Sequence, residues 1–245
     1  MPLNPNTMTT PQIAIFLKRA PLFANLSPER LDALAREFHL FAYPRGNIIF
    51  HQGEKGRAMY VIVTGKVRIY KTTTDGRETT TNIFTTGDIF GEFAIFDRLP
   101  RSATAKTLTK CGLLQISDDE FMRHLRASPE LAEATVRMLA TKTRWTAAIA
   151  EALVQYDAAS RLLHILLLYV DQLGEKQAGG RYVLDWGLNQ SDLASLLGVR
   201  REWLNQVLKQ WQKRRMLVFA EGKITILDLP RLMAEREARR ETRET

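Results

Sequence analysis

The chain has 245 residues, of which 45% are hydrophobic and 25% are charged. This length and composition predict one large globular domain or two modest ones and exclude a chain too polar to fold. No apolar run approaches the ~20 residues needed to cross a bilayer. Residues 1–10 are polar and lack the basic-then-apolar layout of a signal peptide. We therefore expect a cytoplasmic protein with no membrane contact.

Few residues of the kinds that bind metals or carry catalysis stand together in the sequence. The chain has one cysteine, Cys111, and four histidines that share no metal-ligand spacing, so we expect neither an intrachain disulfide nor a metal. No Ser–His–Asp set or paired carboxylates stand at motif-like spacing. We therefore do not expect an enzyme.

Basic residues are concentrated in one segment. The formal net charge is +8, and residues 200–215 contain six basic residues against one acid. Such an excess indicates a polyanionic partner, although a charge run can also be a solvated helix face.

The N-terminal half changes from helical to strand-like patterning. Residues 10–41 have a helical pattern in which Ser27 and Pro28 mark a helix start. From Phe41 to Ile116, short apolar runs are separated by glycines at near-regular spacing. This arrangement predicts an all-β sandwich or barrel.

A long helix is predicted from Pro129 onward, with no glycine or proline before Gly174. Two interleaved heptad lines run along it: Leu131, Met138, Trp145 and Ala152, and Thr135, Lys142, Ile149 and Tyr156. Lines spaced three and four residues apart predict a coiled-coil seam between two copies of the chain. The alternative is a helix packed against its own β domain. From these lines we take Leu131, Met138, Trp145, Ile149 and Tyr156 as the dimer seam.

The segment from Leu188 to Leu217 predicts a helix-turn-helix. Asn189 can cap a helix with Leu193, Leu196 and Leu197 on its apolar face, and Gly198 allows the turn. A second helix from Arg200 directs Leu204, Val207, Leu208 and Trp211 inward. The polar face of this second helix suits base edges in the major groove. A hairpin that turns at Glu221–Gly222 is expected to form the wing beside it. A generic pair of helices is the alternative. The predicted DNA-binding residues are Asn189, Gln190, Arg200, Arg201, Glu202, Asn205, Gln206 and Lys209.

Residues 87–105, GDIFGEFAIFDRLPRSATA, have features of an anion site. Backbone amides at the start of a short helical turn can hold an anion, and Arg101 can add a charge-assisted bond to a phosphate oxygen. Glu92 can accept a hydrogen bond from a ribose hydroxyl, so the pairing favours a nucleotide. A buried Glu92–Arg101 salt bridge is the alternative.

Taken together, these motifs resemble the cyclic-AMP receptor protein family of bacterial transcription regulators, the CRP/FNR superfamily, over about residues 12–230. The resemblance implies an α+β fold: an N-terminal β jelly-roll cyclic-nucleotide-binding domain, a long dimerisation helix and a C-terminal winged helix-turn-helix. The expected boundaries are 12–128 for the sensor domain, 129–156 for the helix, 158–230 for the DNA-binding domain and 231–245 for a charged tail.

The resemblance also implies residue roles. Gly91 and Glu92 would hold the ribose, Arg101 and Ser102 the cyclic phosphate, and Thr146 the purine. The full expected nucleotide set is Phe90, Gly91, Glu92, Phe93, Arg101, Ser102 and Thr146. Tyr156 and Asp157 would form the hinge between domains, and RNA polymerase is an expected partner, with His39 near its contact surface.

Two positions depart from the family pattern. Ala147 stands where responders to cyclic AMP often carry a hydroxyl, and Gln206 stands where many relatives have arginine. The expected function is a homodimeric, cAMP-responsive regulator of a near-palindromic DNA site. The alternatives are a regulator that responds to cGMP, cyclic di-GMP or no ligand, and a sensor that acts only through protein partners.

Overall fold

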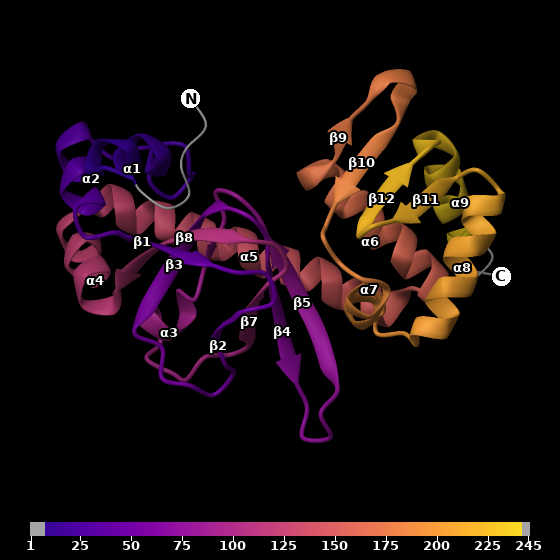
Figure 1. Cartoon of the computed structure of the whole chain (residues 1–245), viewed down its shortest axis with the longest axis horizontal. Helices are drawn as coiled ribbons and strands as arrows, with labels where there is room; N and C mark the ends of the chain where they lie inside the picture. The colour runs from indigo at the N-terminus through magenta and orange to yellow at the C-terminus, as the bar shows by residue number, and fades with distance from the viewer. Residues whose placement is uncertain (1–7, 242–245) are drawn as a thin grey trace. The chain divides into compact units, whose positions relative to one another are not determined.

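The structure, a computed structural model, describes residues 8–241, with side chains at all of these positions except 172, 173, 240 and 241. It divides into two compact units, residues 1–143 and 144–245. The boundary falls inside the long helix α5 (Pro129–Gln155) (Figure 1). Residues 242–245 of the expected charged tail lie outside the described residues.

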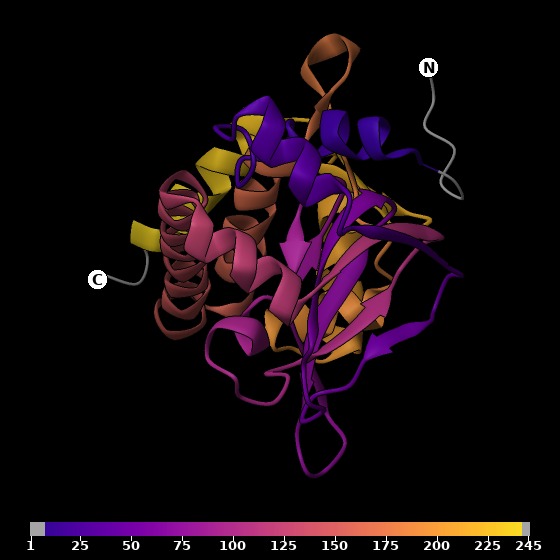
Figure 2. The same cartoon turned by 90° about the vertical axis from the view of Figure 1, so that its left-hand side faces the viewer.

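The first unit is built mainly from two antiparallel sheets. Its strands are β1 (His39–Tyr43), β2 (Ile48–Phe50), β3 (Ala58–Thr64), β4 (Val67–Thr72), β5 (Glu78–Phe84), β6 (Ile89–Phe90), β7 (Thr104–Thr107) and β8 (Cys111–Ser117). One sheet has the order β1-β8-β3-β6 and the other β2-β7-β4-β5. The two sheets are the expected jelly roll. The β4–β5 hairpin extends away from α1 (Thr10–Leu17) and α2 (Pro28–Ala35) (Figures 1 and 2).

The strand β3 is apolar and buried along nearly its whole length. Successive side chains of a strand point to opposite faces. Here Met59, Val61 and Val63 join a core with the helices, whereas Tyr60 and Ile62 join a core with residues of the second sheet. The sequence of β3 therefore has no polar face because both of its faces are covered.

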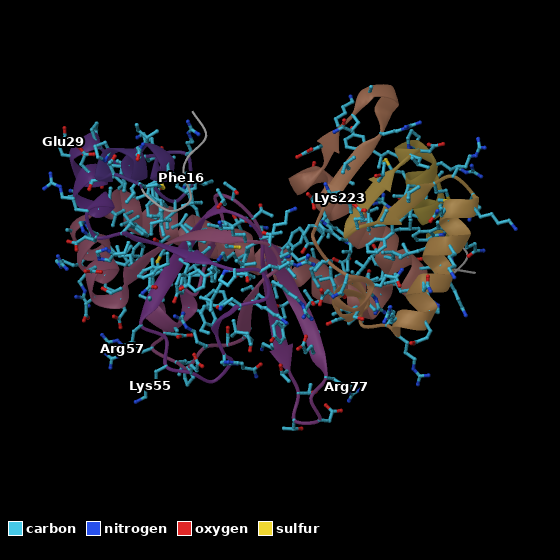
Figure 3. The ribbon with its side chains drawn as sticks, viewed as in Figure 1. Phe16, Glu29, Lys55, Arg57, Arg77 and Lys223 are labelled. Carbon is cyan, nitrogen blue, oxygen red and sulfur yellow. The ribbon has the colours of Figure 1, made fainter. Side chains whose placement is uncertain are left out.

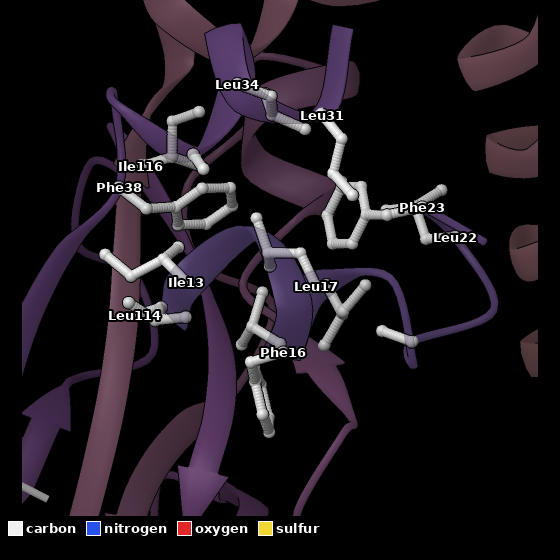
Figure 4. Close-up of a cluster of buried hydrophobic side chains, with 14 of the residues drawn as sticks. Ile13, Phe16, Leu17, Leu22, Phe23, Leu31, Leu34, Phe38, Leu114 and Ile116 are labelled. Atoms are coloured by element: carbon white, nitrogen blue, oxygen red, sulfur yellow. The ribbon is translucent and has the colours of Figure 1, made fainter. Parts of the chain in front are cut away.

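Helices close one side of this jelly roll. Ser27 caps α2 by accepting a hydrogen bond from the Arg30 amide, as the sequence predicts. Phe23 and Phe38 meet edge to face, with ring centroids 6.0 Å apart, inside a cluster that continues to Leu114 and Ile116 of β8 (Figure 4). The helix α4 (Asp118–Ala127) follows β8, and its residue Phe121 joins the same core.

The second unit contains the remaining helices and a third sheet. Its elements after α5 are α6 (Ala158–Leu173), β9 (Glu175–Lys176), a short 3₁₀ turn (Ala178–Gly180), β10 (Tyr182–Asp185), α7 (Gln190–Leu197), α8 (Arg201–Lys213), β11 (Leu217–Ala220), β12 (Lys223–Ile226) and α9 (Leu229–Glu241). The sheet has the order β11-β12-β10-β9. This is a winged helix-turn-helix with β11 and β12 as the wing, which confirms the predicted fold class.

Candidate functional site

The first candidate site lies where β6 meets the one-turn helix α3 (Phe93–Phe96). Gly91 has φ +81°, and a Cβ at this position would stand 2.8 Å from Nη1 of Arg101 and 3.3 Å from the Ala58 carbonyl oxygen. A side chain therefore fits neither the backbone conformation nor the space. Glu92 is the N-cap residue of α3, and its carbonyl oxygen accepts hydrogen bonds from the amides of Ile95 and Phe96.

Arg101 is a buried cation held mainly by neutral groups. Its Nη1 donates to the Gly91 carbonyl oxygen at 2.6 Å and its Nη2 to the Ala58 carbonyl oxygen at 2.7 Å. Its guanidinium lies 4.1 Å from the ring centroid of Phe50, while its buried Nε has no hydrogen-bond partner among residues 8–241. An unsatisfied buried donor on a cation is a costly arrangement that an anion would complete.

Burial lowers the pKa of the Arg101 guanidinium, and the neighbouring Tyr60, Glu54 and Glu92 oppose this shift. The loop before β3 also approaches Arg101 closely. A Cβ on Gly56 would lie 2.9 Å from Cζ of Arg101. The exposed side chains of Lys55 and Arg57 point outward from this loop (Figure 3). The loop thus covers the guanidinium with backbone and places further positive charge outside it.

Glu92 has a partner that the sequence does not reveal. Lys142 of α5 places Nζ 2.7 Å from Oε1 of Glu92 and 2.6 Å from the Ile89 carbonyl oxygen. The Glu92 side chain is only 3% exposed, and Lys142 Nζ also lies 4.9 Å from the ring centroid of Phe84. The expected alternative, a Glu92–Arg101 salt bridge, is replaced by this pair. The signal available in sequence was a lysine in a heptad line that also contains Ile149 and Tyr156.

The other expected nucleotide residues differ in exposure. Phe90 is buried and stacks on Tyr60 with ring centroids 5.0 Å apart, so it forms part of the core beneath the site. Phe93 and Ser102 are exposed. Thr146 is an exposed residue of α5 in the second unit. The structure thus brings together Gly91 and Arg101 directly, with Phe90 supporting them.

The second candidate site is the helix pair α7 and α8. Asn189 caps α7 by accepting a hydrogen bond from the Asp192 amide at 2.9 Å, and Gly198 ends the helix at φ +64°. Leu193, Leu196, Leu197, Leu204, Leu208 and Trp211 are buried, whereas Val207 is half-buried. The remaining face of α8 is polar.

That polar face carries the expected base-reading side chains. Glu202, Gln206, Lys209 and Lys213 follow one another at the spacing of a single helix face, and all are exposed. Arg201 is exposed in the first turn of α8, Asn205 is half-buried, and Arg200 stands at the N-cap position. Gln190 begins α7. A helix with this pattern can lie in the major groove with its first turns facing base edges.

The end of α8 forms a Schellman motif with an unusual residue. The Met216 amide donates to the Trp211 carbonyl oxygen, and the Arg215 amide donates to that of Gln212. Arg215 has φ +55°, although glycine is the common residue there and a side chain costs roughly 1–2 kcal/mol. The strained turn leads directly into the wing.

The break between α5 and α6 occurs at the expected hinge. Asp157 caps α6 by accepting a hydrogen bond from the Ser160 amide at 2.7 Å. Arg161 then donates to carbonyl oxygens at two helix ends: Leu197 of α7 at 2.5 Å and Tyr156 at 3.3 Å. One guanidinium therefore connects the end of the long helix to the first helix of the helix-turn-helix.

The heptad residues of α5 have partners within their own chain. Leu131 is buried in the core of the first unit, and Met138 packs against it. Trp145 meets Tyr169 with ring centroids 5.2 Å apart, and Tyr156 lies 5.0 Å from His164. Ile149 is half-buried. These contacts agree with the alternative in which the helix packs against its own chain. The assignment of these residues to a dimer seam stays a prediction.

Within residues 8–241, no three His, Cys, Asp or Glu side chains come together in a way that could hold a metal ion. No helix in that part of the chain is long and apolar enough to cross a membrane.

Comparison with known proteins assigns both units. Residues 40–128 match the family model of the cyclic nucleotide-binding domain, and residues 160–235 match that of the Crp-like helix-turn-helix domain. A CRP-like cAMP-activated global transcriptional regulator of Mycobacterium tuberculosis is 32% identical over 216 residues, or 88% of this chain and 96% of the relative. The cyclic AMP receptor protein of Thermus thermophilus is 29% identical over 86% of this chain and 94% of its own length.

Solved structures share the fold at lower identity. FixK2 from Bradyrhizobium japonicum has a TM-score of 0.72 at 22% identity, covering 80% of this chain and 96% of that one. The c-di-GMP responsive regulator CLP of Xanthomonas campestris has a TM-score of 0.69 at 22% identity, covering 82% and 100%. The M. tuberculosis relative is a transcription regulator, and neither family model indicates an enzyme family. The chain belongs to the CRP/FNR family of transcription regulators, which combine a cyclic nucleotide-binding domain with a DNA-binding helix-turn-helix.

Proposed function

We propose that this protein is a cytoplasmic, homodimeric transcription regulator that binds cAMP in its first unit and a near-palindromic DNA site through α8. RNA polymerase is its proposed protein partner. The observation that carries the nucleotide half of the proposal is the buried guanidinium of Arg101, whose Nε has no hydrogen-bond partner within the described part of the chain. The sensor is assigned to residues 12–128, the dimerisation helix to 129–156 and the DNA reader to 158–230.

Arg101 and Ser102 take the cyclic phosphate in this proposal. An anion of this kind offers oxygens to a cation whose present partners include two carbonyl oxygens and an aromatic ring. Charge-assisted hydrogen bonds in a buried place are stronger than neutral ones. The exposed hydroxyl of Ser102, next in the chain, adds a donor.

Gly91 and Glu92 take the ribose, and Lys142 becomes part of this subsite. Because Lys142 already donates to Glu92, it orients that carboxylate while another donor approaches. Phe93, exposed at the start of α3, would cover the sugar.

Thr146 takes the purine, which is the basis for choosing cAMP. The named activities of the M. tuberculosis and T. thermophilus relatives agree with this choice. The alternatives are cGMP, cyclic di-GMP or constitutive binding, and the c-di-GMP responsive CLP shares the fold. Ala147 leaves one hydroxyl fewer beside the base than the family pattern implies.

A second copy of the chain would pack on the exposed face of α5. The original heptad lines face the chain itself, but lines shifted by one residue are exposed or half-exposed: Val136, Thr143 and Ala150, and Leu139, Thr146 and Leu153. Their spacing alternates between three and four residues, as in a coiled-coil seam. The pattern supports a dimer in a register one residue away from the predicted one, with Thr146 in the seam.

Two threonines test the dimer and its register. Thr143 and Thr141 are both exposed, and each donates its hydroxyl to the carbonyl oxygen four residues earlier. Thr143 lies on the shifted seam, whereas Thr141 lies on the far side of the helix. Under mild oxidation, we expect T143C, but not T141C, to form a disulfide-linked dimer. A monomer in sedimentation experiments would overturn the dimer, and cross-linking of T141C alone would overturn the register.

DNA-fragment selection tests the whole function. The full chain is incubated at fixed salt with random duplexes, without ligand or with cAMP, cGMP or cyclic di-GMP. We expect a near-palindrome to be enriched with cAMP alone, and R101Q to abolish that response. Absence of an enriched site under every condition would overturn DNA regulation and favour a sensor acting on proteins. Equal enrichment under all conditions would overturn ligand control alone.

A further inference from the structure

The C-terminal end of the recognition helix α8 is tied to α9 by a two-point ion pair. Arg214 is the C-cap residue of α8. Its Nη2 donates to Oε2 of Glu235 at 2.7 Å and its Nη1 donates to Oε1 at 3.2 Å. The Arg214 guanidinium thus bonds both carboxylate oxygens of Glu235, and such a bidentate pair fixes the relative orientation of the two groups as well as their separation.

Two further contacts strengthen the same junction. Arg239, one turn along α9, donates from Nε to Oε1 of Glu235 at 3.0 Å. Arg231 donates from Nη1 to the carbonyl oxygen of Arg214 at 3.1 Å, where the helix would otherwise leave that group unpaired. Hydrogen bonding by Arg214 lowers the pKa of the Glu235 carboxyl, and the pair raises the pKa of Arg214. At this junction the Glu235 carboxylate is therefore bonded by two guanidinium groups, and the Arg214 carbonyl oxygen is bonded by a third.

The position of this junction in the fold gives it a mechanical role. The chain runs from α8 through the wing strands β11 and β12 to α9, so the Arg214–Glu235 pair closes a loop of 21 residues around the wing. The strained turn at Arg215 follows directly after Arg214 in the chain. A helix of 13 residues is about 20 Å long, so a small tilt at its C-terminal end displaces the base-reading first turn.

We propose that Glu235 acts through Arg214 as a clamp that sets the angle of the recognition helix, so that Arg214 is a positioning residue and not a phosphate contact. This inference rests on the proposed function, in which α8 reads DNA. The competing role is suggested by the neighbouring charges, since Lys213 and Arg215 flank Arg214 in the basic segment. The exposed Lys213 has no ion-pair partner among residues 8–241, and thus differs from Arg214.

The two roles predict opposite effects of removing the carboxylate. If Arg214 contacts phosphate, E235Q releases it and removes a negative charge near DNA, so binding becomes tighter for every sequence. If the pair is a clamp, E235Q weakens binding to the specific site and leaves binding to unrelated DNA almost unchanged. Glu237 offers a matched control, because it lies on α9 and is paired only with the adjacent Arg236 among the described residues.

The experiment compares wild type, R214Q, E235Q, R214Q/E235Q and E237Q in the full chain. Affinity is measured over a salt series for the duplex enriched by selection and for a scrambled duplex of equal length. We expect R214Q and E235Q each to weaken specific binding by roughly threefold to tenfold, since partly exposed pairs contribute modestly and a dimer carries two. We expect the double variant to match the single ones, and the scrambled duplex and the salt slope to be unchanged. E237Q should not lose specificity.

Three results would overturn the clamp: tighter binding by E235Q, additive losses in the double variant, or a flatter salt slope in R214Q. Equal losses on both duplexes together with a lower unfolding temperature would also overturn it, because they indicate general destabilisation. If wild type shows no preference for any duplex, the proposed function itself fails. If wild type discriminates and E235Q discriminates equally well, only the clamp fails.

Discussion

Lys142 donates a hydrogen bond of 2.7 Å to Glu92 across 50 residues of sequence, and the same Nζ reaches the carbonyl oxygen of Ile89. The long helix α5 is thereby attached to the segment from β6 to the start of α3, where Gly91 and Glu92 lie. The Glu92 side chain is 3% exposed, and Lys142 is the cation that hydrogen-bonds to it. Any ligand donor that approaches Glu92 shares the carboxylate with Lys142.

Removal of Lys142 should destabilise the first unit. In K142Q, Glu92 keeps its burial and loses the opposite charge, which typically costs 3–5 kcal/mol when one member of a buried pair is removed. We expect about 2–4 kcal/mol here because Lys142 is partly exposed. Urea unfolding of the full chain measures this, and E92Q/K142Q should recover part of the loss. A K142Q variant as stable as wild type would show that the pair contributes little.

Replacement of Arg101 by lysine should not preserve nucleotide binding. A lysine retains the charge but lacks the planar fork that now reaches two carbonyl oxygens and leaves Nε for an anion. We expect cAMP affinity to fall roughly 10- to 100-fold in R101K, since hydrogen bonds to charged groups contribute about 1.5–3 kcal/mol. Calorimetric titration measures the affinity, and unchanged unfolding of the variant serves as the control. Equal affinity would place the phosphate elsewhere.

Loss of Arg201 should relax sequence reading. This side chain is exposed in the first turn of α8, where arginine suits a guanine edge. We expect R201A to lose roughly 1–3 kcal/mol of binding and its preference at one base pair of each half-site. Repeating the DNA-fragment selection with the variant gives both results. A uniform loss over all sequences would instead indicate a phosphate contact at Arg201.

Acid should weaken the second unit through His164. Burial lowers the pKa of this imidazole from its ordinary value of 6.5; Arg236 lowers it further, and Glu151 opposes the shift. The unfolded chain therefore binds the proton more readily than the folded chain. The contribution of neutral His164 to the free energy of unfolding is present above about pH 6.5 and is lost as pH falls through the lower folded pKa.

The pH effect can be measured with a single substitution. His164 lies against Tyr156 beside the break between α5 and α6, and H164N keeps a polar side chain of similar size without a titrating ring. We expect the difference in urea midpoint between pH 7.5 and pH 5.5 to shrink in H164N, with the exposed His51 replaced in H51N as control. A pH dependence that H164N leaves unchanged would exclude His164 as its source.

Local features were predictable because a few neighbouring residues determine them. Ser27, Asn189 and Gly198 stand where the helices begin or end, because a cap needs only the amides or carbonyls of the adjacent turn. The end of the strand-like pattern at Ile116 similarly agrees with the structure, since β8 ends at Ser117 and α4 begins at Asp118 with a capping box on Ser117.

Contacts between distant segments were less accessible. A heptad line predicts that a helix face is covered but does not say whether the chain or a second copy covers it. Leu131 and Trp145 have intrachain partners, and the polar Lys142 in the second heptad line is accounted for by its bond to Glu92. The role of Arg214 likewise depends on Glu235, which a charge run alone does not connect to it.

The burial of Cys111 has a practical consequence for measuring motion in this protein. Its thiol lies among the sheets, donates to the carbonyl oxygen of Lys66 and has a pKa raised by burial. Because it is the only cysteine in the chain, thiol-reactive dyes should leave the folded wild-type protein unlabelled. Single introduced cysteines can therefore carry fluorescent or spin labels without removal of the native one, and distances between labelled helices can be followed as nucleotide is added.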